Sequence, residues 1–400
     1  MQTYQSTLSR VTSPTVPAAD LATLAADDLA FATDLYQAVR KQSGNLFYSP
    51  YSIYLALAMT YAGAKGQTAS QMARALHFSL PPDRLHPALD SLDLQLASRG
   101  KGAKGQDGQG FRLKIASSIW GQDGYRFLQP FLDTLAKYYG AGLRTLDFGA
   151  SPEAARQTIN TWVKDQTEGK IPDLLPRGAI DALTRLVLVN AIYFNAAWAS
   201  PFSETATKPA PFHLLDGKSV DVPTMSDTFS LPYYKGQGCQ AVALPYDGDD
   251  LDLVILLPDA GTFAQFEHGL TAGQVKQCLD ALSSRQVALS LPKLKYESQL
   301  DLVDTLKSMG MTDALDASKA DFTGMTEGRE LYISDVVHKA ILSLDEKGTE
   351  AAAATGVVMR LTAALRVDAT VAVDRPFVFL IRDVTTGAVV FVGRVLDPSA

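Results

Sequence analysis

Residues 346–355 read EKGTEAAAAT and form the most informative stretch of the 400-residue chain. They lie between residues 331–344 and residues 375–381, two segments rich in β-branched and aromatic side chains. The stretch has too few turn residues for a tight hairpin and is too apolar for an ordinary linker. Alternate residues of a strand face one side of a sheet, and the set that starts at Thr349 is small up to Thr355. The pattern favours a segment that can enter a sheet as a new strand; an alanine-rich helix or linker is the alternative.

The wider pattern indicates one mixed fold. Helical periodicity over residues 27–42 predicts an amphipathic helix, and Ser49 followed by Pro50 is typical of a helix start. The continuous apolar run over residues 186–194 predicts a strand that is buried on both faces. Because helices gather in the first half and strands in the second, the order favours the α+β class over a regular βαβ series.

Several stretches match one known family in its own order. Residues 346–355 resemble the hinge of the reactive loop of an inhibitory serpin, a family of serine protease inhibitors, and residues 335–340 and 375–380 resemble the strands around it. Further resemblance lies in residues 45–64, 187–202, 291–293 and 321–325. The resemblance covers roughly residue 25 to the end of the chain.

The resemblance implies an α+β serpin fold. It has a large mixed central sheet, two smaller sheets, about eight or nine helices and an exposed reactive loop over about residues 346–374. We expect a flexible tail over residues 1–24 and a single domain over residues 25–400, because the first residues are rich in Ser, Thr and Pro.

The implied function is suicide inhibition of serine proteases by a protein that is not an enzyme. The cut loop would insert into the central sheet and carry the covalently bound protease with it. The hinge residues are Glu346, Gly348, Thr349, Glu350, Ala351, Ala352, Ala353, Ala354 and Thr355. The alternative is a serpin-fold carrier, chaperone or storage protein that does not inhibit, but small hinge residues argue against it.

Two counts give different positions for the scissile bond. The family's spacing from Gly348 gives Thr362-Ala363, which suits elastase-like or subtilisin-like proteases. Counting back from Pro376 points near Leu365-Arg366. Arg360 and Arg366 would suit trypsin-like proteases, while Leu361 and Leu365 would suit chymotrypsin-like ones. We favour Thr362; cysteine proteases are further candidate targets.

The resemblance also nominates two groups of polar residues. The shutter cluster, at the centre of the main sheet, contains Ser49, Ser52, Asn190 and His338. The breach group, at the top of the place where the main sheet would open to admit the loop, contains Trp198, Lys293 and Glu346. For His338 an ordinary hydrogen-bonded core histidine is the simpler interpretation.

Composition excludes several function classes. A net charge of −7 and a pI near 5.3 argue against nucleic-acid or anionic-membrane partners. The two cysteines are too few for a disulfide scaffold or metal cluster and predict free buried thiols. We expect a monomer without cofactors. The sequence leaves the compartment open: extracellular or periplasmic after removal of a signal peptide, and otherwise cytoplasmic.

Overall fold

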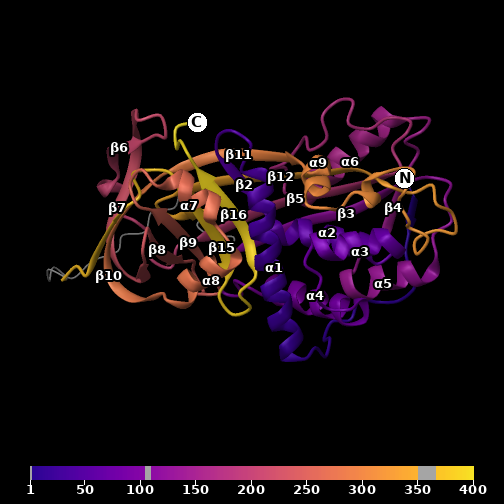
Figure 1. The fold of residues 1–400 in the computed structure, drawn as a ribbon, viewed down its shortest axis with the longest axis horizontal. Helices are drawn as coiled ribbons and strands as arrows, with labels where there is room; N and C mark the ends of the chain where they lie inside the picture. The colour runs from indigo at the N-terminus through magenta and orange to yellow at the C-terminus, as the bar shows by residue number, and fades with distance from the viewer. Residues whose placement is uncertain (1, 104–109, 350–365) are drawn as a thin grey trace.

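The computed structural model describes residues 2–103, 110–349 and 366–400. In these ranges it contains nine α-helices and two β-sheets, which confirms the expected α+β class (Figure 1). The helices are α1 (Ala18–Val39), α2 (Pro50–Tyr61), α3 (Gly66–Ala75), α4 (Pro82–Ala97), α5 (Gln129–Tyr139), α6 (Pro152–Gln166), α7 (Phe263–Gly269), α8 (Ala272–Asp280) and α9 (Val303–Ser308).

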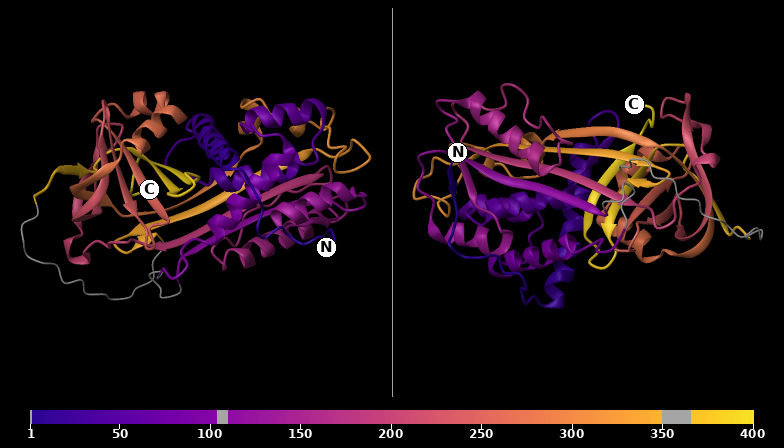
Figure 2. Two further views of the ribbon diagram at one scale, coloured as in Figure 1. Left: turned by 90° about the horizontal axis from the view of Figure 1, so that it is seen from below. Right: turned by 180° about the vertical axis from the view of Figure 1, so that it is seen from behind.

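Sheet A has seven strands and runs through the middle of the molecule, with helices on both sides (Figure 2). In spatial order its strands are β1 (Gln2–Tyr4), β4 (Leu143–Leu146), β3 (Arg112–Gln122), β5 (Leu186–Ala197), β13 (Gly348–Thr349), β12 (Ile333–Asp345) and β11 (Leu294–Asp301). Strands β5 and β12 pair with each other in parallel over most of their length, and β13 separates them at one end.

Strand β5 is buried on both faces, as its apolar run predicts. Val187, Val189 and Ala191 belong to a hydrophobic cluster with residues of α6. Leu188 and Ile192, which alternate with them, belong to the main core on the side of α2. Because α2 and α6 cover opposite faces, any strand that joined sheet A beside β5 would be buried from both sides.

Sheet B differs from the expected two smaller sheets, because the structure joins its strands into one nine-stranded sheet. Strand β7 (Ser219–Lys235) makes the connection: it pairs with β6 and β10 along most of its length and with β8 at its end. The other strands are β2 (Leu46–Tyr48), β6 (Lys208–His213), β8 (Cys239–Pro245), β9 (Leu251–Pro258), β10 (Ser283–Pro292), β14 (Ala369–Ala372), β15 (Phe377–Asp383) and β16 (Val389–Val395).

The N-terminal segment also differs from the expectation of a flexible tail and a helix that starts at residue 27. Helix α1 begins at Ala18, and β1 pairs with β4 at the edge of sheet A. The Ser6 hydroxyl donates to Asp133, and the Arg10 guanidinium contacts Asp90 and Asp93 of α4. Paired backbone groups and buried ionic contacts therefore hold this segment against the body.

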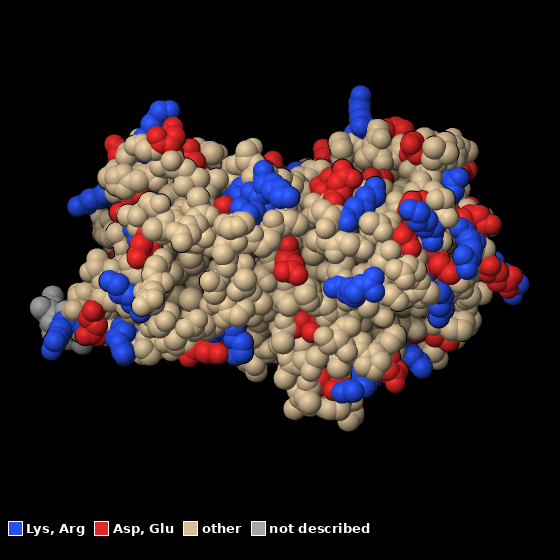
Figure 3. Space-filling model, viewed as in Figure 1, with Lys and Arg blue, Asp and Glu red and all other residues tan. Residues whose placement is uncertain are grey.

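The surface carries charges of both signs. On the face in Figure 3, acidic and basic side chains are interspersed without a large region of one sign. Among the described helices, none combines the length and hydropathy that would be needed to cross a membrane.

Candidate functional site at the opening of sheet A

The seam between β5 and β12 is the central feature of the site. The two strands pair in parallel from Ile333 to Ala340, and this register places His338 opposite Asn190. Towards the other end, β13 occupies the space between them and pairs antiparallel with both. The seam is therefore closed over most of its length and already holds two residues of the hinge at one end.

The structure brings all four predicted residues of the shutter cluster together. The Asn190 Oδ1 atom lies 2.5 Å from His338 Nδ1 and accepts from the Ser52 hydroxyl at 2.7 Å. The Asn190 amide donates to the Ser52 carbonyl at 2.8 Å, and the backbone N–H of Ser49 donates to His338 Nε2 at 3.0 Å. These bonds link β5, β12 and the N-terminus of α2.

His338 is neutral in this environment. Burial lowers the pKa of its imidazole to about 3, and its Nε2 atom accepts from the Ser49 N–H. The proton therefore lies on Nδ1, which donates to Asn190 across the seam. Since buried polar groups must remain hydrogen-bonded, parting of β5 and β12 requires a new partner for His338 Nδ1, whereas Asn190 Oδ1 still accepts from the Ser52 hydroxyl.

The breach group is assembled at the end of the seam where β13 enters. The Lys293 ammonium lies 2.9 Å from a Glu346 carboxylate oxygen, and the Thr207 hydroxyl donates to the other oxygen at 2.7 Å. Burial opposes ionisation of Glu346, but the hydrogen bonds from Lys293 and Thr207 outweigh it and lower the pKa of the carboxyl group. Glu346 is therefore held as a carboxylate at neutral pH.

Trp198 fixes the backbone where the hinge begins. Its indole N–H donates to the Asp345 carbonyl at 2.9 Å, and its backbone N–H donates to the Lys347 carbonyl at 2.8 Å. Its ring stacks on Tyr246, with 4.7 Å between the ring centroids. The two hydrogen bonds hold the chain on both sides of Glu346.

The first hinge residues have strict steric requirements. Gly348 has φ +152°, and a Cβ atom there would collide with the Ala196 carbonyl of β5. Thr349 is 2% exposed, and its hydroxyl lies 2.7 Å from the Tyr246 hydroxyl. Small side chains are therefore required at the point where the chain enters the seam.

Several of the predicted site residues lie outside the described ranges. The structure describes Arg366, which is exposed, but gives no account of the other hinge and scissile-bond candidates. These are Glu350, Ala351, Ala352, Ala353, Ala354, Thr355, Arg360, Leu361, Thr362, Ala363 and Leu365.

Three residues of the site were not predicted from the sequence. The Ser117 hydroxyl of β3 accepts from the Asn190 amide at 2.7 Å, and Thr207 and Tyr246 contact Glu346 and Thr349. Strand alternation places Ser117 on the face of β3 that carries Ile115 and Ile119 and packs in the main core, so no sequence signal marked it as a partner of Asn190. Within the described ranges, no group of three His, Cys, Asp or Glu residues could hold a metal ion. The prediction of two buried thiols is correct for Cys239 and wrong for Cys278, which is half-buried.

These features define a class of protein. Its members have a mixed sheet in which side-chain hydrogen bonds join two central strands, here β5 and β12. The start of a loop rich in small residues already lies between these strands. Comparison with known proteins agrees, because residues 27–398 match the family model described as "Serpin (serine protease inhibitor)". The chain belongs to the serpin family.

Relatives and solved structures resemble the chain over most of its length. The leukocyte elastase inhibitors of Bos taurus and Sus scrofa are 40% and 41% identical over 386 residues, which cover 94% of this chain and 99% of each relative. The native-state crystal structure of tengpin, a thermophilic serpin, has a TM-score of 0.87 and 29% identity, and the match covers 99% of this chain and 100% of that one. These names give no support to an extracellular location.

Proposed function

We propose that the protein inhibits serine proteases as a suicide substrate. A protease attacks the loop after Thr349 and forms its acyl-enzyme, as in ordinary hydrolysis. The freed loop then enters the seam between β5 and β12 as a new strand. The protease, still bound through the ester, is carried with it and distorted before deacylation.

The entry of β13 between β5 and β12 is the observation that carries this proposal. Two hinge residues, Gly348 and Thr349, already pair with both neighbouring strands. Insertion would extend the same pairing along the seam. About 15 residues at about 3.3 Å each would move the end of the loop by about 50 Å.

The shutter cluster controls this step in the proposal. Before cleavage, the His338–Asn190 bond closes the seam. During insertion that bond breaks, while Asn190 retains Ser52 and Ser117 as partners. Each ladder bond that the new strand gains contributes about 1 kcal/mol, which favours the inserted state once several residues have entered.

An elastase-like serine protease is the target class that we propose. The curated relatives named above are inhibitors of leukocyte elastase, and the family's hinge-to-bond spacing points to Thr362-Ala363. A small residue before the scissile bond fits the small specificity pocket of elastase. Subtilisin-, trypsin- and chymotrypsin-like proteases are the competing classes, and cysteine proteases are further targets to test.

The test mixes the protein with one protease of each class and separates the products on denaturing gels. We expect a complex that survives denaturation with the elastase-like protease, together with a released C-terminal peptide that starts at Ala363. The peptide mass identifies the scissile bond. If the proteases cleave the loop but none of them forms a stable complex, the proposal of inhibition is overturned and a non-inhibitory serpin is favoured.

A further inference from the structure

Tyr246 lies directly after β8 and contacts the start of the loop. Its hydroxyl oxygen lies 2.7 Å from the hydroxyl oxygen of Thr349, and both side chains are buried. The two residues are 103 positions apart in sequence, so this bond joins the end of a strand of sheet B to the hinge in sheet A. Among the described residues, neither hydroxyl has another hydrogen-bond partner.

Packing fixes the position of the Tyr246 ring. The Trp198 indole stacks on it with 4.7 Å between the ring centroids, and the Phe194 ring packs at right angles to it at 5.1 Å. The backbone is held as well, because the Tyr246 N–H donates to the Leu251 carbonyl at 2.9 Å and Tyr246 forms an isolated β-bridge with Trp198. The Tyr246 hydroxyl therefore cannot follow Thr349 if the hinge moves away.

The bond favours the position in which the hinge has entered the seam. While β13 pairs with β5 and β12, the Tyr246 hydroxyl keeps its partner. Withdrawal of Thr349 would leave this completely buried hydroxyl without a partner, which is unfavourable. Growth of the strand beyond Thr349 leaves Thr349 in place, so the bond need not break. The contact therefore opposes withdrawal of the hinge and does not oppose insertion.

We propose that Tyr246 is a positioning residue that holds Thr349 in the seam before the loop is cut. The inference rests on the proposed function, because early entry of the hinge matters for inhibition only if the loop inserts. With the hinge held, the new strand grows from two residues that are already paired, and this first pairing does not have to form in competition with deacylation. Because Tyr246 is completely buried, it acts through Thr349 and not by contact with the protease.

Hydrogen exchange of the uncut protein measures withdrawal of the hinge without a protease. The backbone N–H groups of β13 are protected while the strand is paired and exchange when it withdraws. When re-entry is faster than exchange, the exchange rate is proportional to the population of withdrawn molecules. Tyr246→Phe removes the hydroxyl and keeps the ring. We expect this variant to raise the exchange rate of the peptide that contains β13 about tenfold, the size expected for loss of one buried hydrogen bond.

A double-mutant cycle separates this role from a general loss of stability. Thr349→Val removes the same bond from the other side and keeps a side chain of similar size. In the Thr349→Val background, Tyr246→Phe should have no further effect on exchange of β13, whereas independent effects would multiply. Thr349→Ser retains the hydroxyl and should keep the exchange rate close to that of the wild type.

Tyr54→Phe is the matched control. Tyr54 is also completely buried, but its hydroxyl has no partner in the described ranges, and its ring packs against Phe31 and Phe78. We expect the control to leave exchange of β13 unchanged. The proposal would be overturned by an equal exchange rate of β13 in Tyr246→Phe and the wild type, or by an undiminished effect in the Thr349→Val background. An equal rise in the peptides of β15 and β16 would also overturn it, because it would indicate global unfolding.

The inference and the proposed function can fail separately. If no protease forms a covalent complex but exchange of β13 responds as expected, inhibition is wrong and Tyr246 still holds the hinge. If complexes form and exchange of β13 does not respond, inhibition stands and the assignment of Tyr246 is wrong. Where complexes form, Tyr246→Phe should give more cleaved protein per complex than Tyr54→Phe on the same gels. Equal ratios for the two variants would overturn the role of Tyr246 in inhibition.

Discussion

Thr349 is the residue at which the insertion mechanism can be tested with a single change. Its side chain is buried between β5 and β12 and contacts Tyr246. Thr349→Arg would place a charge in the seam at a cost of several kcal/mol. Since each 1.36 kcal/mol slows a step about tenfold, deacylation should overtake insertion and convert the inhibitor into a substrate.

The measurement is the ratio of cleaved inhibitor to covalent complex on denaturing gels. Thr385→Arg is the matched control, because Thr385 is exposed in the turn between β15 and β16. We expect the control to behave like the wild type. If Thr349→Arg formed as much complex as the control, Thr349 would not be a residue that must enter the sheet.

Asp28 is a buried carboxyl group that makes stability depend on pH. Its Oδ2 atom accepts from the Val389 N–H at 2.7 Å, while its Oδ1 atom is buried without a partner in the described ranges. Burial raises its pKa to about 7 despite the Val389 bond, and the charge of Asp27 adds to the increase. Because the folded-state pKa is raised, the stability from this group is present below about pH 4 and is lost as pH rises through about 7.

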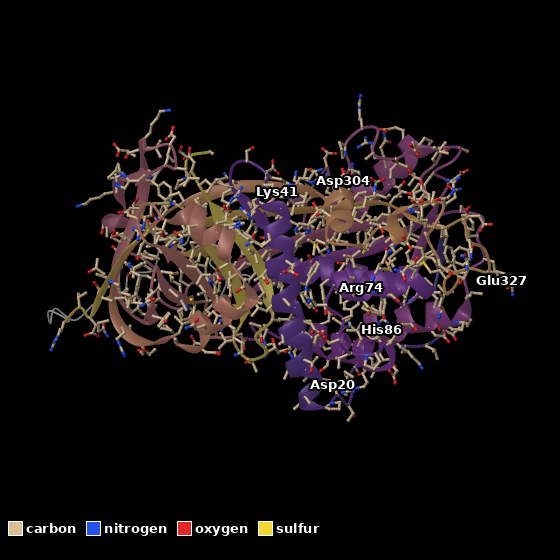
Figure 4. The ribbon with its side chains drawn as sticks, in the orientation of Figure 1. Asp20, Lys41, Arg74, His86, Asp304 and Glu327 are labelled. Carbon is tan, nitrogen blue, oxygen red and sulfur yellow. The ribbon has the colours of Figure 1, made fainter. Side chains whose placement is uncertain are left out.

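Asp28→Asn keeps an acceptor for Val389 and removes the ionisation. We expect the variant to gain about 1–3 kcal/mol over the wild type at pH 8 and little at pH 4, as measured by urea unfolding. Asp304→Asn, at an exposed position of α9, is the control and should change neither value (Figure 4). A gain at pH 8 no larger than that at pH 4 would show that Asp28 does not titrate in this range.

His338 has the opposite pH dependence. Its folded-state pKa is lowered to about 3, so its unfolded state takes up a proton first as pH falls below about 6.5. Stability from this group is therefore lost between about pH 6.5 and pH 3. The Asp28→Asn variant keeps the contribution of His338, so its free energy of unfolding should fall mainly as the pH drops below about 6.5.

At the scale of elements, the sequence predicted those strands and helices that carry a local signal, such as a continuous apolar run or a helix-capping residue. The apolar run of β5 and the Ser49–Pro50 start of α2 are both present in the structure. The N-terminal segment was missed because a three-residue strand and a few long-range polar contacts have no periodic signal. The joining of sheet B was missed because β7 changes partners along its length.

The candidate site was also predicted only in part. Family order nominated Asn190 and His338, which the structure brings into hydrogen-bond contact. Ser117 and Tyr246 were missed because their importance arises only from strand register and from packing across the two sheets. Residue types and periodicity could therefore be used to predict single elements, whereas the pairing of residues that are distant in sequence could be seen only in the structure.

The anchored N-terminal segment leads to a prediction for Arg10. Its guanidinium lies 2.8 Å from Asp90 and 2.6 Å from Asp93, and Asp90 is completely buried. Burial raises the pKa of Asp90, and the contact with Arg10 offsets part of this increase. Arg10→Met should therefore destabilise the protein by about 1–3 kcal/mol, because a buried carboxyl group loses its partner.

Urea unfolding at pH 7 measures this effect. Arg126→Met, at an exposed position before α5, is the matched control and should stay within about 0.5 kcal/mol of the wild type. Equal midpoints for the two variants would mean that the contacts of Arg10 with Asp90 and Asp93 do not contribute to the stability of the protein.

At the scale of the whole molecule, the proposed mechanism makes the closed seam the place where a conformational change follows cleavage of the loop. The shutter cluster closes β5 on β12, and β13 occupies one end of the same seam. In the proposed mechanism, a cut in the loop removes the covalent tether, so that the residues after Thr349 can enter the seam. The inserted strand would then be covered by α2 and α6 on opposite faces of sheet A.

We therefore predict that cleavage of the loop by a protease that is not trapped raises the thermal midpoint by about 10–20 °C. Ten or more new backbone hydrogen bonds would add about 1 kcal/mol each to the free energy of unfolding. Dividing this gain by the unfolding entropy expected for a chain of this length gives a shift of this order. Differential scanning calorimetry of cut and uncut protein measures the shift, and cut Thr349→Arg is the control that should gain little, because its hinge carries a charge into the seam. An unchanged midpoint in the cut wild-type protein would show that the loop does not insert, and would favour the non-inhibitory serpin even if the loop is a good protease substrate.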